Sequence, residues 1–197
     1  GRELKLKKLL QAPFTLHSRI IILINREIKN AKAGRPARII AKMNALTERK
    51  IVDKLYAASQ AGVKIELIIR SACTLKPGIK GLSDNITVKS ILGRFLEHTR
   101  IYYFENGGNP EIYCGSADLM ERNLSRRVEI LFPVIDQEIL DHLKQNLDLM
   151  LSDNTLAFNL QQDGSYRRIR KKAQDPEINS QLKLLEWYAE ENLFGSV

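Results

Sequence analysis

The chain has 197 residues, 44% of them hydrophobic, and its 31 lysines and arginines against 23 aspartates and glutamates give a formal charge of +8. This length allows one well-buried core but not two large ones, and the charge favours polyanionic partners such as nucleotides, polyphosphate, nucleic acid or anionic lipid. Two cysteines without a CxxC pair argue against a disulfide framework, and no apolar run is long enough to span a bilayer. The same cysteine usage favours reduced thiols in a cytoplasmic protein. Because the opening GRELKLKKLL lacks an initiator Met and is typical of the middle of a protein, we expect a piece of a larger polypeptide.

Two helices are predicted in the first third of the chain. Apolar residues at helical spacing follow Ser18, a good N-cap, and stop at Gly34. A second set follows Asn44 or Thr47, either of which could cap it, and ends at Gly62. One β-rich run separates the two helices and another follows the second helix. This order predicts a right-handed crossover between two parallel strands.

Short runs of β-branched, aromatic and other apolar residues predict the strands. They cover residues 37–43, 63–70, 86–92, 100–105, 111–115, 128–134 and 155–160. The turn NGGNP joins the fourth and fifth runs as a hairpin, so the sheet should be mixed. A helix over 136–151 and a last amphipathic helix, carrying Leu182 and Leu185, complete the pattern. The expected fold class is α/β, a mixed sheet flanked by helices in a single domain.

The segment HTRIYYFENGG carries the first chemical signal, with His98 two residues before Arg100 and Glu105 five residues further on. An imidazole can attack phosphorus or transfer a proton, provided that nearby cations neutralise the phosphate oxygens. On a strand, His98 and Arg100 would point to the same side. We therefore predict phosphate chemistry with His98 as the catalytic residue and Arg100 as a phosphate ligand. The alternative is a half-buried histidine that only bonds a carbonyl at the start of a strand.

Two further features could complete such a site. The turn that contains Ser116 and Asp118 could place hydroxyl and backbone donors close to an anion, although a tight turn is the simpler reading. Arg70 ends a predicted strand and Arg127 precedes another, and a guanidinium can bind two phosphate oxygens at once. Each arginine could equally form a surface ion pair. The basic tract 166–172 could contact a polyanion, but an exposed basic face explains it as well.

The pattern H-x-[KR]-x4-[DE] followed by GS resembles half of the active site of the phospholipase D superfamily, with Arg100 in place of Lys and Glu105 in place of Asp. Longer strings are more distinctive. FLEH-x-RIY-x-FENGG and SAD-x-M-x-RN-x-x-x-R-x-E resemble the C-terminal domain of bacterial polyphosphate kinase, and the likeness covers nearly the whole chain. The resemblance implies a phospholipase D-like sheet with helices on both faces.

The resemblance also implies a function. Enzymes of this family transfer the terminal phosphate of ATP reversibly onto polyphosphate through a phosphohistidine, with Mg²⁺. The family's ATP-contacting arginine falls on Arg70, its second essential histidine on His98, and the arginine of the RN-x-x-x-R element on Arg127. Glu105, Ser116 and Asp118 could support these ligands. The phosphorylated histidine and the magnesium ligands are expected in the preceding domain, so we expect no metal ligand here and no activity from this chain alone.

The resemblance divides the chain into a lead-in over 1–17, a phospholipase D-like catalytic half-domain over 18–160, and a basic tract with a C-terminal helix over 161–197. The expected partners of the chain are ATP or ADP, polyphosphate and the preceding domains of the same polypeptide. The resemblance also implies a homo-oligomer that could associate with a membrane surface and does not bind nucleic acid.

Two alternative functions remain open. A phospholipase D-type phosphodiesterase or nuclease could form by homodimerisation, with one His98 from each chain, or the chain could be a non-catalytic polyanion-binding module.

Overall fold

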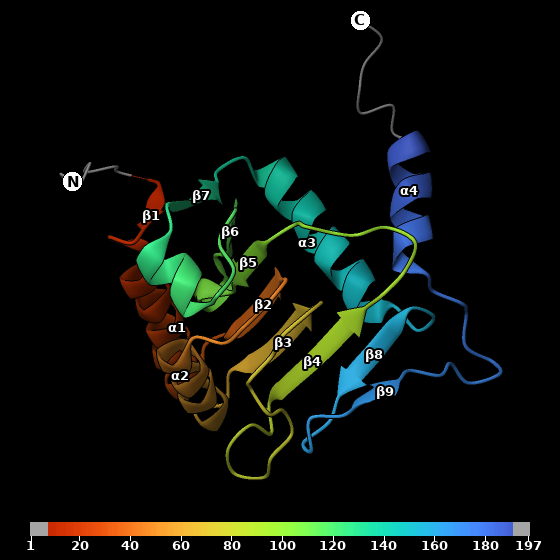
Figure 1. The fold of residues 1–197 in the computed structure, drawn as a ribbon, viewed down its shortest axis with the longest axis horizontal. Coiled ribbons are helices and arrows are strands. Elements are labelled where there is room, and N and C mark those ends of the chain that lie inside the picture. Colours follow the sequence, from red (N-terminus) through yellow and green to blue (C-terminus); the bar gives the residue numbers. More distant parts are fainter. Residues whose placement is uncertain (1–7, 191–197) are drawn as a thin grey trace, which may run out of the picture.

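The structure is a computed structural model that describes residues 8–190. Within them, nine strands form one mixed sheet in the order β1-β7-β6-β5-β2-β3-β4-β8-β9 (Figure 1). The strands are β1 (Leu10–Ala12), β2 (Arg38–Met43), β3 (Lys64–Ile69), β4 (Ile86–Ile91), β5 (Ile101–Phe104), β6 (Glu111–Gly115), β7 (Glu129–Val134), β8 (Ala157–Leu160) and β9 (Tyr166–Arg168). All seven predicted strands are present, each within two residues of its predicted ends.

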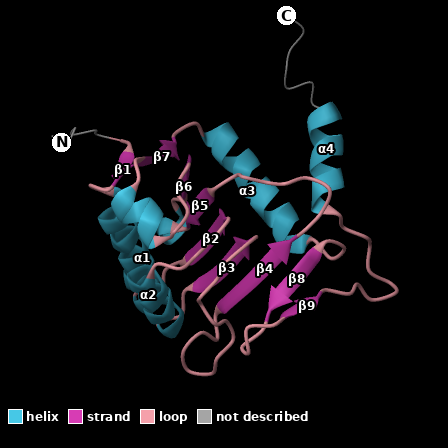
Figure 2. Ribbon diagram, in the orientation of Figure 1, coloured by secondary structure: helices cyan, strands magenta, loops and turns pink. Residues whose placement is uncertain are grey.

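Helices cover both faces of the sheet, as predicted (Figure 2). They are α1 (Leu16–Lys32), α2 (Arg49–Gln60), α3 (Gln137–Ser152) and α4 (Ser180–Glu190), with a short 3-10 turn η1 (Asn106–Gly108) and a π-helical turn η2 (Arg122–Arg126). Because side chains alternate along a strand, Ile39 of β2 packs in the core under α1 and α2, whereas Ile40 packs in the core under α3. The fold is therefore a single α/β domain with two apolar layers.

Strand directions bring several chain segments to one edge of the sheet. Strands β2, β3 and β4 are parallel, whereas β5 is antiparallel to β2, β6 to β5, and β7 to β6. The ends of β2, β3 and β6 therefore meet the beginnings of β5 and β7. We call this the carboxyl edge. Asn44, Arg70 and Ser116 follow strands there, Arg100 precedes β5, and Glu129 begins β7. Polar residues in a sheet of this kind gather at such an edge.

Both predicted helix caps are wrong. Helix α1 begins at Leu16, and Ser18 lies inside it with its hydroxyl donating to the carbonyl of Thr15 at 3.0 Å. Helix α2 is capped by Glu48, whose carboxylate accepts the Ile51 N–H at 2.7 Å. Asn44 cannot serve as that cap because its backbone N–H and side chain both bond Asp118, a residue 74 positions away.

Two three-residue strands, β1 and β9, were not predicted, because three residues are too few to show an alternating pattern. Strand β1 pairs with β7 and buries Leu10 and Ala12, so part of the predicted lead-in 1–17 belongs to the sheet. Strand β9 begins the basic tract and is exposed. The predictions for residues 1–7 and 191–197 lie outside the described part of the chain. Among the described helices, none is long and apolar enough to cross a bilayer.

Candidate functional site

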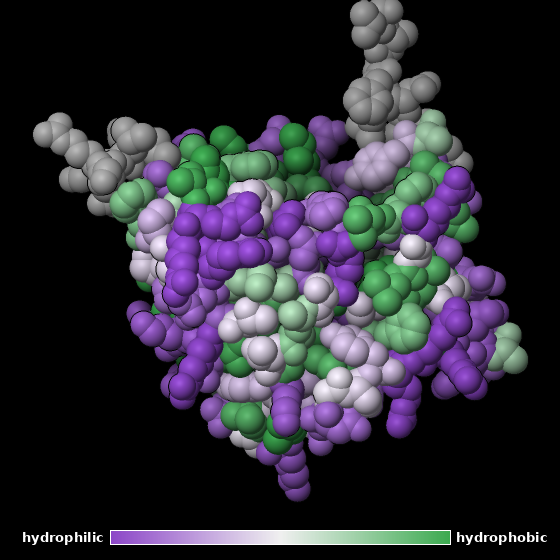
Figure 3. Space-filling view, viewed as in Figure 1, coloured by the Kyte–Doolittle hydropathy of each residue, from purple (hydrophilic) through white to green (hydrophobic). Residues whose placement is uncertain are grey.

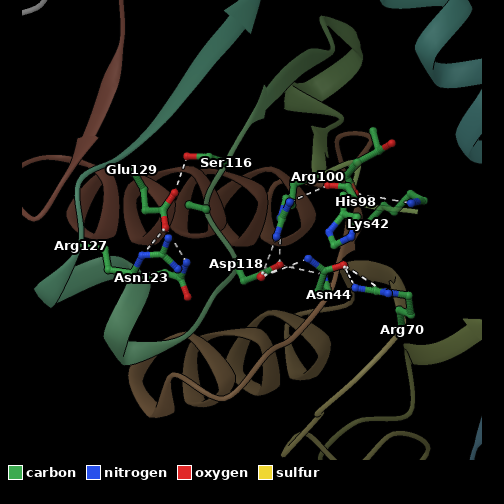
Figure 4. Close-up of polar contacts among 12 residues, drawn as sticks. Lys42, Asn44, Arg70, His98, Arg100, Ser116, Asp118, Asn123, Arg127 and Glu129 are labelled. Atoms are coloured by element: carbon green, nitrogen blue, oxygen red, sulfur yellow. Dashed lines mark hydrogen bonds and ion pairs between the residues drawn. The ribbon is translucent and has the colours of Figure 1, made fainter. Parts of the chain in front are cut away.

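A continuous set of polar contacts runs along the carboxyl edge around Asp118 (Figure 4). One carboxylate oxygen, Oδ1, accepts the Asn44 backbone N–H at 2.7 Å and Arg100 Nε at 3.2 Å, and Oδ2 accepts Arg100 Nη2 at 3.2 Å and Asn44 Nδ2 at 3.3 Å. The side-chain oxygen of Asn44 accepts Arg70 Nε at 3.2 Å and Nη2 at 2.9 Å. We call Arg70, Asn44, Asp118 and Arg100 the Asp118 cluster. It joins the ends of β2 and β3 to the beginning of β5.

The predicted pair His98 and Arg100 is brought together, but in a different way from the one expected. His98 is exposed in the loop between β4 and β5, and β5 begins only at Ile101, so the two residues do not share a strand. Instead, the Arg100 side chain turns back and donates from Nη1 to the His98 carbonyl at 2.6 Å. Arg100 therefore fixes the backbone that carries the imidazole.

A second group, which we call the Glu129 cluster, lies where β6 ends and β7 begins. The buried Glu129 accepts hydrogen bonds from the Ser116 hydroxyl and, at 2.7 Å, from Asn123 Nδ2 of η2. Arg127 Nε lies 3.4 Å from the same carboxylate, while 55% of the Arg127 side chain remains exposed. Figure 4 shows Glu129, Asn123 and Arg127 grouped on the other side of Asp118 from Arg70. Arg127 is the most exposed of the three predicted arginines that contact these clusters.

The GS pair that follows β6 has a structural explanation. A Cβ atom on Gly115 would lie 2.0 Å from the Ile130 carbonyl oxygen, so only glycine lets β7 approach this closely. The Ser116 hydroxyl donates to Glu129 and accepts the Ile130 N–H at 3.3 Å. Its hydrogen is therefore used inside the protein. The expectation that Ser116 offers a hydroxyl donor to an anion is wrong for this conformation.

Glu105 does not join the site. It follows β5 at the opposite end from Arg100, where it accepts the Tyr103 hydroxyl at 2.6 Å and its N–H donates to the Arg38 carbonyl. Five residues of extended chain place it roughly 16 Å from Arg100. The spacing in H-x-R-x4-E thus spans the whole strand. The predicted support of His98 by Glu105 is contradicted by this placement.

Tyr102 of β5 is fully buried. Its hydroxyl donates to the Ala117 carbonyl at 2.6 Å. Burial raises the pKa of this phenol well above its ordinary value, the charges of Asp118 and Glu129 raise the pKa further, and Arg100 opposes them. Tyr102 is therefore a neutral hydrogen-bond donor that holds the turn between β6 and η2.

Sequence reasoning missed Lys42 and Asn123, and it named Asn44 only as a helix cap. Lys42 is a buried lysine of β2 whose Nζ lies 2.9 Å from Glu97 Oε2 and 3.5 Å from the Thr99 carbonyl oxygen. A lysine within a run of apolar strand residues, ARIIAKM, was the available signal, since a buried charge requires a partner. A small pocket lies beside it, lined by Lys42, Met43, Ile68, Arg70, Ile91 and Glu97.

The residues of this edge do not form a magnesium site of their own. Among residues 8–190, no group of three or more histidines, cysteines, aspartates and glutamates is placed to hold a metal ion. The carboxylates of Asp118 and Glu129 are already bonded to donors of the same chain. Proteins bind magnesium through one or two carboxylates whose oxygens are free, together with water and substrate phosphates, so these two engaged carboxylates do not fit it.

A family model described as polyphosphate kinase C-terminal domain 2 matches residues 9–181. The chain belongs to this family. Polyphosphate kinase of Pseudomonas aeruginosa is 52% identical over 186 residues, and that of Burkholderia vietnamiensis is 55% identical over 186 residues. Each alignment covers 94% of this chain but only 27% of the relative, so this polyphosphate kinase domain spans about a quarter of the length of its relatives.

Solved structures agree with this assignment. The crystal structure of polyphosphate kinase from Porphyromonas gingivalis superposes with a TM-score of 0.92 at 32% identity, covering 97% of this chain and 29% of that one. A phospholipase D family member, Nuc from Salmonella typhimurium, superposes with a TM-score of 0.53 at 12% identity over 72% of this chain and 90% of that one. The second likeness concerns the fold alone. The polyphosphate kinase domain therefore has a phospholipase D-like fold.

Proposed function

We propose that this domain forms one wall of the site at which a polyphosphate kinase transfers the terminal phosphate of ATP reversibly onto polyphosphate. The observation that carries the proposal is the convergence of Arg70, His98 and Arg127 on one edge of a domain of this family. Three positively charged or protonatable side chains at one edge suit a polyanionic substrate.

Arg70 and Arg127 are the proposed phosphate ligands. Arg70 contacts a neutral amide oxygen through two of its five N–H groups, and Arg127 contacts Glu129 at the long distance of 3.4 Å. Both guanidinium groups therefore keep donors for phosphate oxygens. Arg100 is engaged more fully, since three of its five N–H groups already bond Asp118 or the His98 carbonyl and only 18% of its side chain is exposed. We assign it mainly to holding Asp118 and the His98 backbone in place.

The proposed role of His98 is that of a proton donor or phosphate ligand, because its imidazole is exposed at the carboxyl edge. In the forward direction, the bond between the γ-phosphorus and ADP breaks while a bond to a histidine nitrogen of the preceding domain forms. That phosphoryl group then passes to a terminal oxygen of polyphosphate, and the histidine is regenerated. We also propose that the magnesium ligands lie in that preceding domain. The full-length enzyme is proposed to be a cytoplasmic homo-oligomer.

A chimera tests the proposal. This chain would replace the matching 186 residues of the Pseudomonas aeruginosa polyphosphate kinase, and ATP-dependent polyphosphate synthesis would be measured. We expect an active chimera that loses activity in the variant His98→Ala. A chimera in which His98→Ala keeps full activity would contradict the assigned role.

A labelling experiment separates this proposal from its alternatives. With labelled ATP, we expect phosphohistidine in the chimera and none in the 197-residue chain alone. Stable labelling of His98 in the isolated chain would make His98 the nucleophile and overturn the division of roles. Hydrolysis of a bis-nitrophenyl phosphodiester by a dimer of the chain would instead indicate a phosphodiesterase.

A further inference from the structure

The loop that carries His98 has little apolar packing of its own. Between β4 and β5 it exposes three large hydrophobic side chains: Leu92, Phe95 and Leu96 are 55%, 44% and 71% exposed. Figure 3 shows green, hydrophobic surface in this region beside α4. A loop with few buried apolar contacts opens easily unless polar contacts hold it. The contacts that do so therefore decide where the His98 imidazole lies.

Gln181, in the first turn of α4, holds the loop from one side. Its side-chain oxygen accepts the Phe95 N–H at 3.0 Å, and its Nε2 donates to the Phe95 carbonyl at 3.0 Å and to Glu97 Oε1 at 2.8 Å. Gln181 is 6% exposed, so both N–H groups and the oxygen of its amide are used without competition from water. The glutamine pairs with the backbone of Phe95 as a neighbouring strand would.

Lys42 of β2 holds the same loop from the other side. Its ammonium group lies 2.9 Å from the second oxygen of Glu97 and 3.5 Å from the Thr99 carbonyl. Glu97 is thus fixed by Lys42 and Gln181 together, and both neighbours of His98 in the chain are bonded to rigid elements. The His98 carbonyl itself is fixed by Arg100.

Gln181 is itself anchored. Asp153, which follows α3 as its C-cap and is 1% exposed, accepts the Ser180 N–H and the Ser180 hydroxyl, each at 2.7 Å. On the loop side, Gly93 makes room for the amide, because a Cβ atom there would lie 2.3 Å from Gln181 Oε1. The glycine has no positive φ in this structure, so its lack of a side chain, rather than its backbone, is what the contact requires.

We infer that Gln181 and Lys42 are positioning residues that fix the loop between β4 and β5 and thereby set the place of the His98 imidazole. They act on His98 through its neighbours in the chain, Phe95, Glu97 and Thr99. The hydrogen bonds and the ion pair described above support the claim that the loop is held in place. The claim that this matters for catalysis rests on the proposed function. It gives the C-terminal helix α4 a role at the carboxyl edge.

Amide hydrogen exchange on the 197-residue chain tests the fixation. Gln181→Met keeps the length and packing of the side chain but removes its three hydrogen bonds, and we expect the Phe95 amide to exchange about tenfold faster. Gln60→Met is the matched control, since the exposed Gln60 bonds the carbonyl of Gly81 in another loop at 3.0 Å. Equal Phe95 exchange in wild type and Gln181→Met would overturn the inference.

Gly93→Ala disturbs the same contact from the loop side, because the added methyl group would lie 2.3 Å from Gln181 Oε1 and 2.7 Å from Leu156 Cδ1. We expect it to reproduce the faster Phe95 exchange. A Gly93→Ala chain whose Phe95 amide stays as protected as in wild type would show that Gln181 does not hold the loop through this contact. Thermal unfolding of each variant identifies any general loss of structure.

Activity in the chimera completes the test. We expect Gln181→Met to lower kcat roughly tenfold with little change in KM, less than the ~100-fold that a misplacement of ~1 Å can cost, and Gln60→Met to leave kcat unchanged. If His98→Ala abolishes activity while Gln181→Met frees the loop without lowering kcat, the positioning role is overturned. If His98→Ala keeps activity, the proposed function fails instead, and the exchange result alone decides whether Gln181 and Gly93 fix the loop.

Discussion

The Asp118 cluster and the Glu129 cluster are built alike but do different things. Each surrounds a buried carboxylate with an asparagine and an arginine. In the first, 18% of the Arg100 side chain is exposed and all its nitrogens are bonded, whereas in the second 55% of the Arg127 side chain is exposed and one long contact holds it. The difference teaches that an arginine beside a strand can be enclosed by the protein or left in contact with solvent. Burial, and not position in the sequence, decides which.

The largest effect should come from Asp118→Ala. The substitution removes four accepted hydrogen bonds and leaves the mostly buried Arg100 without its carboxylate, so we expect the free energy of unfolding to fall by roughly 3 kcal/mol. Urea denaturation measures it. The control Asp163→Asn alters an exposed aspartate whose hydrogen bonds go to Ser165, two residues away, and it should leave the midpoint nearly unchanged. Equal midpoints for Asp118→Ala and wild type would contradict the structural role of this cluster.

Glu129→Gln should cost less, about 1–2 kcal/mol. The amide keeps one acceptor oxygen for Asn123, the Ser116 hydroxyl can rotate to accept from the new NH₂ group, and the exposed Arg127 remains solvated. The same urea titration measures the loss. A cost above that of Asp118→Ala would reverse the comparison between the two clusters.

Tyr102→Phe should cost about 1 kcal/mol at neutral pH, because the Ala117 carbonyl loses a buried donor. The raised pKa of Tyr102 adds a pH dependence. The folded state keeps this phenol neutral while the unfolded chain loses its proton near pH ~10, so the associated stability is present below that pH and lost above it. The difference in unfolding free energy between wild type and Tyr102→Phe should therefore shrink above pH ~10. A difference that grows there would contradict the burial of the hydroxyl.

Arg127→Ala should have the smallest effect on folding, within about 0.5 kcal/mol, since most of its side chain is already in water. In the chimera, the same substitution should lower kcat/KM roughly tenfold to a hundredfold if Arg127 binds phosphate. Urea denaturation and polyphosphate synthesis measure the two quantities separately. A stable variant with unchanged kcat/KM would remove Arg127 from the ligand set.

Arg100→Ala is the partner experiment. Here stability should fall together with activity, because Asp118 loses its charged partner and the His98 backbone loses a hydrogen bond. A variant with full stability and reduced activity would indicate that Arg100 contacts the ligand directly. In that case Arg100 and Arg127 would have the same role.

Local patterns predicted most of the fold. Strand 111–115 has the predicted bounds, and the helix expected over 136–151 is α3 over Gln137–Ser152. The predicted helix starts were wrong where several residues near the start could each act as the N-cap. Ser18, Asn44 and Thr47 are all good N-cap residues, but Thr15 and Glu48 precede the helices, and Asn44 is bonded instead to a distant aspartate.

For the candidate site, the sequence predicted which residues take part better than it predicted how they are arranged. Arg70, His98 and Arg127 do lie along one edge, because parallel strands end together and antiparallel neighbours begin there. Glu105 belongs to the H-x-R-x4-E motif, yet strand β5 carries it to the opposite edge of the sheet. Nothing in the sequence placed Gln181 near His98, since the two lie on segments more than 80 residues apart.

The sequence by itself determined the α/β class, the helices and strands, and the family motifs, because periodicity and turn chemistry act over a few residues. Only the tertiary structure decided which arginine is bonded, which is exposed, and what holds the His98 loop. Those properties depend on contacts such as Asn44 with Asp118 and Glu97 with Gln181, which join residues 74 and 84 positions apart. Burial at such contacts strengthens the hydrogen bonds and ion pairs that hold the carboxyl edge, and burial exists only once the chain has folded.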